Sequence, residues 1–193
     1  MSTRGMYTFI DPPEKDRKVS RRRFHIYRHM DNYPTGARQA IARALPFAWA
    51  LPRFEADEFA AAFVAGNKPR PGSADPGGGI RIVGGTSDAD RRRFAGDVEY
   101  RYEITAQPEN KGGALMVKAY SAHCNSWAGG TDPGEASAWA ESLLYDGPFE
   151  EWDAERTEAE AIDGRGATRD VAPGLTVTVV TDADLKGASD GGA

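Results

Sequence analysis

Residues 98–104 carry the most regular pattern in this chain, a strict alternation of side-chain character. The apolar members are Val98, Tyr100, Tyr102 and Ile104, and the charged members are Glu99, Arg101 and Glu103. Successive side chains of a β-strand point to opposite faces of its sheet. The segment therefore predicts a strand with one buried face and one wet face.

Other segments supply partners for this strand. We predict strands at 6–10, 24–30, 80–83, 115–120 and 175–180. The first two form a hairpin with a long polar tip, and 115–120 returns antiparallel to 98–104 after a turn. All of these runs are short and rich in aromatic or β-branched residues, as strands are.

Helical spacing of apolar residues marks four further segments. From Ala37 to Trp49 the apolar residues fall on one helical face, which places Trp49 in the core. Pro46 predicts a kink there or a break that opens a second short helix. A second helix begins with acidic residues at 55–58 and ends at a Gly66-Asn67 C-cap. A third runs from Asp132-Pro133 to Leu144 and is stopped by Asp146-Gly147. A fourth, acidic and peripheral, is predicted at Glu150 to Glu160.

The order of these elements predicts an α+β fold, a mostly antiparallel sheet with two or three helices packed on one face. A chain of 193 residues fits one domain. We expect that domain to span residues 1–182, with a flexible Pro- and Gly-rich loop at 67–79 and a disordered tail at 183–193.

Cysteine content and hydropathy limit where in the cell the protein is expected to work. Cys124 is the single cysteine and cannot form an internal disulfide, and the N-terminal stretch lacks the apolar core of a secretory signal. The longest apolar-rich run, Ala44 to Leu51, is far shorter than a membrane span and contains Pro46. We therefore expect a cytoplasmic protein with no membrane partner.

The common catalytic fingerprints are missing from this sequence. It contains no phosphate-binding loop, dinucleotide fingerprint, Gly-x-Ser-x-Gly elbow, His-Glu-x-x-His or paired Cys-x-x-Cys. These absences favour a non-enzymatic role, and we expect no cofactor.

Charge is divided between the two halves of the chain. Residues 1–95 hold 17 Lys and Arg against 10 Asp and Glu, and residues 96–193 hold 7 against 19. An acidic surface predicts a basic partner protein. Nucleic acid is the alternative partner, because phosphates bind clustered cations, here Lys15, Arg17, Lys18, Arg21, Arg22 and Arg23.

A sharp strand-to-helix turn is predicted at residues 31–36. Asp31 and Asn32 favour turns, and Thr35 can cap the helix that follows. The N–H groups at a helix N-terminus attract anions. A small-ligand niche is therefore predicted here, with the candidate residues Arg4, His29, Asp31, Tyr33 and Thr35, beside the alternative that the turn is purely structural.

The histidines allow a metal hypothesis, which we weigh against the absence of any metal. His25 and His29 share one face of a predicted strand, and His123 and Cys124 end another. The spacing is not that of a known zinc motif, so the preferred interpretation is a polar sheet face without metal. Trp127, in the loop that follows, is the tryptophan that we expect nearest to a site.

The N-terminal residues resemble a known group of proteins. Thr3-Arg4-Gly5, the following hairpin and Asp31-Asn-Tyr-Pro-Thr-Gly36 are similar to an uncharacterised group of small phage and bacterial proteins with an N-terminal Thr-Arg-Gly or Thr-Arg-Ser and an aromatic-Asp-Gly-Tyr-Pro-x-Gly turn. Met30 and Asn32 stand where that pattern has an aromatic residue and Gly. The resemblance covers the N-terminal quarter and implies a phage or mobile-element context.

Two functions follow as expectations. The first is a non-enzymatic, phage-associated accessory protein that binds a macromolecular partner through its charge-segregated surface. The second is a ligand-binding protein or hydrolase that uses the niche near Arg4, His29 and Asp31. In that case Ser2, exposed by removal of Met1, would be an N-terminal nucleophile whose own amine acts as base.

Overall fold

The computed structural model describes residues 3–13, 21–68, 79–83, 98–108, 112–124 and 139–167. Several predicted features lie outside these residues. They are Ser2, the cations Lys15, Arg17 and Lys18, Trp127, the start of the helix predicted from Asp132, most of the 67–79 loop, the strand predicted at 175–180 and the tail at 183–193.

Six strands form one mixed sheet in the order β3-β2-β1-β4-β5-β6. Their bounds are β1 Gly5–Ile10, β2 Arg23–Arg28, β3 Arg81–Val83, β4 Tyr100–Ala106, β5 Leu115–Cys124 and β6 Trp139–Pro148. The two central strands, β1 and β4, run parallel, and every other neighbouring pair is antiparallel. The predicted α+β fold with a mostly antiparallel sheet is confirmed.

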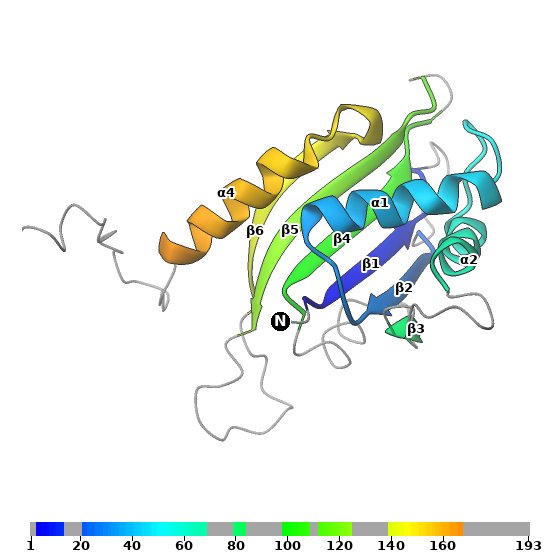
Figure 1. Cartoon of the computed structure of the whole chain (residues 1–193). Coiled ribbons are helices and arrows are strands. Elements are labelled where there is room, and N and C mark those ends of the chain that lie inside the picture. The colour runs from blue at the N-terminus through cyan, green and yellow to red at the C-terminus, as the bar shows by residue number, and fades with distance from the viewer. Residues whose placement is uncertain are drawn as a thin grey trace, which may run out of the picture.

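The helices are α1 Pro34–Ala44, α2 Ala56–Asn67 and α4 Ala154–Ala167, with short 3-10 turns η1 Leu45–Phe47 and η4 Phe149–Glu151. Figure 1 shows α1 lying across the sheet. No helix in the described ranges has the length and apolar character that crossing a bilayer requires.

One large hydrophobic core joins the helices to alternating residues of the central strands. Tyr7 of β1 and Tyr102 of β4 stack with ring centroids 5.1 Å apart. Phe63 of α2 packs on Tyr7, and Trp152, just before α4, packs on Tyr102. Ile41 of α1 is fully buried in the same cluster. The alternation predicted for residues 98–104 thus places the tyrosines under the helices.

The opposite face of the sheet has a smaller apolar cluster. Met6, Tyr27, Val83, Val98 and Ala122 form it. Met6 pairs with Tyr27, and Tyr7 pairs with Ile26, so the two strands present this cluster and the main core on alternate residues. The predicted interpretation of 98–104 as half wet is only partly right, because Val98 joins this second cluster and Arg101 is buried.

The prediction of a helix ending at Leu144 is wrong, because residues 139–148 form β6. This strand pairs antiparallel with β5 along its whole length. The register shifts between Ala119 and Tyr120, which pair with Tyr145 and Leu143, so Leu144 is an extra residue in a β-bulge. The bulge breaks the in-out alternation and leaves apolar residues at a spacing typical of a helix.

The structure also corrects the segment between α1 and α2. The helix ends at Ala44 and Pro46 lies in the 3-10 turn η1, so of the two predicted alternatives, a kink or a break, the structure shows the break. Trp49 is not a core residue, because it lies beyond the helix and 38% of its surface is exposed. Gly66 does not cap α2, because it lies inside the helix.

Candidate functional site

Asn32 is the centre of the predicted strand-to-helix turn. Its side chain is fully buried, and its Nδ2 donates to the carbonyls of Thr3, Arg28 and Met30 at 2.8–2.9 Å. Its Oδ1 accepts a hydrogen bond from the Tyr7 hydroxyl at 2.9 Å. A single side chain therefore ties the N-terminal segment, the end of β2 and the core together.

Backbone geometry at this turn explains its residue choices. Asp31 has φ 55°, a left-handed conformation that Asp tolerates better than most residues. Its carbonyl accepts a hydrogen bond from Arg28 Nη1 and lies 2.2 Å from the place where a Cβ on Gly36 would be. The turn therefore requires a residue without a side chain at position 36.

Tyr7 titrates abnormally because of its place beneath this turn. Burial raises its pKa to about 12, and the nearby charge of Arg28 offsets part of that effect. The hydroxyl consequently stays neutral in the folded protein at pH values where an unfolded tyrosine, with a pKa of about 10, already ionises.

This shift predicts alkaline destabilisation. The contribution of neutral Tyr7 is complete below about pH 10, and it is lost as the pH rises from about 10 towards 12, at about 1.4 kcal/mol for each pH unit. Urea unfolding at stepped pH values measures the slope, with the Tyr7→Phe variant as reference because it has no group to ionise. An equal loss in both proteins would show that Tyr7 does not cause it.

A carboxylate of the chain itself occupies the N-terminus of α1. Glu158 of α4 accepts hydrogen bonds from the Thr35 hydroxyl at 2.5 Å and from the Thr35 backbone N–H at 3.3 Å. A helix N-terminus favours a negative charge. Glu158 therefore takes the place that the sequence assigns to a bound anion, and it fastens α4 to α1.

The remaining residues of the predicted niche contact different parts of the protein. Tyr33 packs on Tyr100 with ring centroids 5.9 Å apart, so it belongs to the core beneath the helices. His29 is exposed and its Nδ1 lies 3.2 Å from the hydroxyl of Tyr27, a residue of the cluster on the opposite face. Arg4 accepts backbone hydrogen bonds through its carbonyl from residues 99 and 100, and Asp31 is exposed at the turn.

The histidines of the metal hypothesis occupy separate positions. His25 is buried, and its Nδ1 lies 3.0 Å from the Thr8 hydroxyl of the neighbouring strand. His123 and Cys124 lie at the end of β5, where the structure describes the backbone only. Across the part of the chain that the structure describes, no three His, Cys, Asp or Glu side chains are placed to hold a metal.

A pocket lies between α1 and the start of α4. Its volume is about 270 Å³, and it is lined by Thr35, Arg38, Gln39, Trp152, Asp153, Ala154 and Glu155. Arg38 forms one wall, because its Nε donates to the Trp152 carbonyl at 3.1 Å and its guanidinium lies 5.2 Å from the centre of the Phe149 ring.

Acidic side chains are exposed along η4 and α4, and two of them, Asp153 and Glu155, line this pocket. The exposed carboxylates are Glu150, Glu151, Asp153, Glu155 and Glu160, which we call the acidic face. Arg156 forms an exposed ion pair with Glu160 at 3.4 Å. Because carboxylates outnumber cations here, the field over the pocket favours a basic group.

The acidic segment is fixed to the body of the protein. Phe149, Trp152, Ala154 and Ala161 are buried in the main core. Asp153 begins α4 by accepting a hydrogen bond from the Arg156 backbone N–H at 3.0 Å. The predicted acidic helix at 150–160 is confirmed from Ala154 onwards, and its apolar anchors Phe149 and Trp152 are the ones that the sequence indicates.

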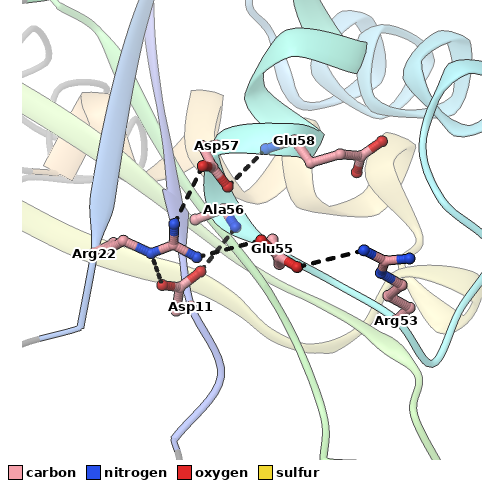
Figure 2. A network of polar contacts seen from close by, with 7 residues as sticks. All are labelled: Asp11, Arg22, Arg53, Glu55, Ala56, Asp57 and Glu58. Carbon is pink, nitrogen blue, oxygen red and sulfur yellow. Dashed lines mark hydrogen bonds and ion pairs between the residues drawn. The ribbon is translucent and has the colours of Figure 1, made fainter.

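Arg22 of the basic run forms contacts within the protein (Figure 2). Arg22 contacts the carboxylates of Asp11 at 2.6 Å, Asp57 at 3.1 Å and Glu55 at 3.6 Å. Asp11 also accepts the first backbone N–H of α2, from Ala56, at 2.8 Å. These contacts join the loop end of the β1–β2 hairpin to α2 and neutralise one of the predicted phosphate-binding cations.

Sequence reasoning missed Arg38, Gln39 and Glu158 as residues around the pocket and the α1 N-terminus. Arg38 and Gln39 were visible only as the polar side of a helix, and Glu158 as one of many carboxylates. Thr35 and Glu158 are 123 positions apart, and no local pattern links them.

Comparison of this chain with protein-family models, curated proteins and solved structures finds no match.

Proposed function

We propose that this chain is a non-enzymatic accessory protein, in a phage or mobile-element context, that binds a basic partner protein through its acidic face. The observation that carries the proposal is the display of five exposed carboxylates on a segment that Phe149, Trp152, Ala154 and Ala161 anchor in the core. Charges held on a fixed scaffold attract an oppositely charged partner with little ordering cost.

The pocket favours the binding of a partner protein over a purely diffuse attraction of counterions. It lies between α1 and α4, and two members of the acidic face, Asp153 and Glu155, line it. A lysine or arginine side chain of a partner fits a recess with carboxylates at its rim. The single cation in the lining, Arg38, is engaged with Trp152 and Phe149.

The alternative functions have less support. A ligand or catalytic site near Arg4, His29 and Asp31 would have to join His29, which contacts Tyr27 of the smaller cluster, to Tyr33, which packs on Tyr100 of the main core. Glu158 already accepts the Thr35 backbone N–H. Nucleic-acid binding by the basic run would compete with the three carboxylates around Arg22.

Charge reversal tests the proposal. In the variant Glu150→Lys, Glu151→Lys, Glu155→Lys and Glu160→Lys, binding to a lysine- and arginine-rich peptide is expected to weaken by at least about 100-fold. Asp153 is left in place because it caps α4. Fluorescence anisotropy of the labelled peptide at physiological salt measures the affinity, and cross-linking in host cells identifies the natural partner and the residues that touch it.

The control has the same change in net charge at another place. It replaces Asp170, Asp182, Asp184 and Asp190 by lysine, all outside the described residues. This control should bind the peptide nearly as wild type does. If both variants lose affinity equally, net charge and not the acidic face governs binding, and the proposal is wrong.

A further inference from the structure

One exposed stripe of α4 changes from acidic to apolar along its length. It consists of Glu155, Ala159 and Ile162, which we call the α4 stripe, and Ile162 is 55% exposed. Residues spaced by four and then three positions lie above one another on one face of a helix. Glu155 also lines the pocket between α1 and α4. The α4 stripe therefore begins with a carboxylate at the pocket and ends, about 10 Å away, at a large apolar side chain.

The carboxylates on either side of the α4 stripe are engaged within the protein. Glu158 accepts hydrogen bonds from the hydroxyl and the backbone N–H of Thr35, and Glu160 pairs with Arg156 at 3.4 Å. Among the α4 side chains that the structure describes, Glu155 is thus the carboxylate left for a partner cation. A partner with charge alone would gain an ionic contact at the pocket and little at the apolar end of the stripe.

The charge around the α4 stripe favours a basic partner. Between Phe149 and Ile162 the sequence has six carboxylates and one cation, Arg156. These charges repel an anionic surface and attract a basic one. An exposed isoleucine in such surroundings complements a basic segment that carries a large apolar residue of its own.

The length of the α4 stripe indicates the conformation of that segment. Side chains on one face of a β-strand are about 6.6 or 13 Å apart, because successive residues rise by about 3.3 Å and alternate between faces. Residues seven positions apart in an α-helix share a face and are about 10 Å apart, which matches the separation of Glu155 and Ile162. Two helices packed side by side bring such pairs into contact.

We propose that the basic partner places an amphipathic helix along α4. A lysine or arginine of that helix enters the pocket beside Glu155, and a large apolar residue seven positions away packs on Ile162. This inference rests on the proposed function, since it specifies the kind of segment that binds the acidic face. It adds an apolar contact that a purely electrostatic interaction would not have.

Two helical peptides of identical composition test the inference. Both are rich in alanine, with lysines at the centre and at the ends, and the first has leucine seven positions before and after the central lysine, which covers both directions of binding. The second has these leucines five positions away, on the other side of the helix. Fluorescence anisotropy is expected to show that wild-type protein binds the first peptide at least about fivefold more tightly, because its leucine is buried against Ile162.

Matched protein variants assign this difference to Ile162. The Ile162→Ser variant is expected to lose the preference for the first peptide and to bind the second as wild type does. Leu143→Ser removes a side chain of β6 that is also 55% exposed, and this variant should keep the preference. Both positions are exposed, and the thermal midpoint of each variant checks the fold.

The outcomes separate this inference from the proposed function. If wild-type protein binds neither peptide, the acidic face does not recognise a basic partner and both proposals are wrong. If it binds the two peptides equally, or if Ile162→Ser keeps the preference, the acidic face binds through charge alone and the helix inference is overturned. It is also overturned if Ile162→Ser converts an oligomer to a monomer, because Ile162 then contacts another copy of this chain.

Discussion

Replacing Asn32 by alanine is expected to lower the free energy of unfolding by about 4 kcal/mol, the largest effect of any substitution considered for this chain. The change leaves three backbone carbonyls and the Tyr7 hydroxyl without their shared partner. Each buried polar group that loses its hydrogen bond costs about 1–3 kcal/mol. Chemical denaturation followed by circular dichroism measures the loss.

Asn67 offers a matched control. Its Nδ2 donates to the Ala40 and Phe63 carbonyls and its Oδ1 accepts from Arg43, but this group is only part-buried. Water can replace these partners, so Asn67→Ala should cost only about 1 kcal/mol. Equal losses at the two positions would contradict the central role of Asn32 in the turn.

The Gly66→Ala substitution is expected to destabilise the protein by about 2 kcal/mol, although alanine is the better helix former. A Cβ at this position would lie 2.3 Å from the carbonyl oxygen of Arg43 in α1. The two helices would have to move apart, which would loosen their packing on the sheet. Thermal and urea unfolding of the variant measure the effect.

An exposed position of the same helix calibrates this result. Ala61 lies on the solvent side of α2, and Ala61→Gly should cost about 1 kcal/mol through helix propensity alone. If Gly66→Ala instead stabilises the protein by a similar amount, the two helices tolerate a side chain there and the close approach is not tight.

Local patterns in the sequence were sufficient for most of the fold. The strand at 100–106 was recognisable from its alternation, and the strands at 5–10, 23–28 and 115–124 from short runs rich in aromatic or β-branched residues. The start of α1 was recognisable from the helical spacing of its apolar residues. The strand β6 was not recognised, because the bulge at Leu144 interrupts the alternation of side chains and leaves two consecutive leucines, Leu143 and Leu144, in the sequence. Pairing with β5 then decides the structure against the local preference.

Trp49 shows a different limit of sequence reasoning. Its spacing continues the apolar face of α1, but the helix ends at Ala44 and the chain is extended at Ala48. Beyond the end of the helix, helical spacing no longer determines which way a side chain points. A proline three residues earlier signalled the break, yet only the structure shows that the aromatic side chain then faces solvent.

The candidate site was the least predictable part. The turn at residues 31–36 was recognised from its residue types, whereas its role as a tie between the N-terminal segment and the core depends on Tyr7 and Thr3. The occupation of the α1 N-terminus by Glu158 depends on the packing of α4, which no local pattern encodes.

The parallel pairing of β1 with β4 has a kinetic consequence. Gly5 lies beside Tyr100 in the centre of the sheet, so this contact closes only after about half of the 193-residue chain has been synthesised. Pairings between such distant segments slow folding because a long loop must close first. Until β4 pairs with β1, that edge of the β1–β2 hairpin stays open, and an open strand edge is a template for incorrect pairing with other strands.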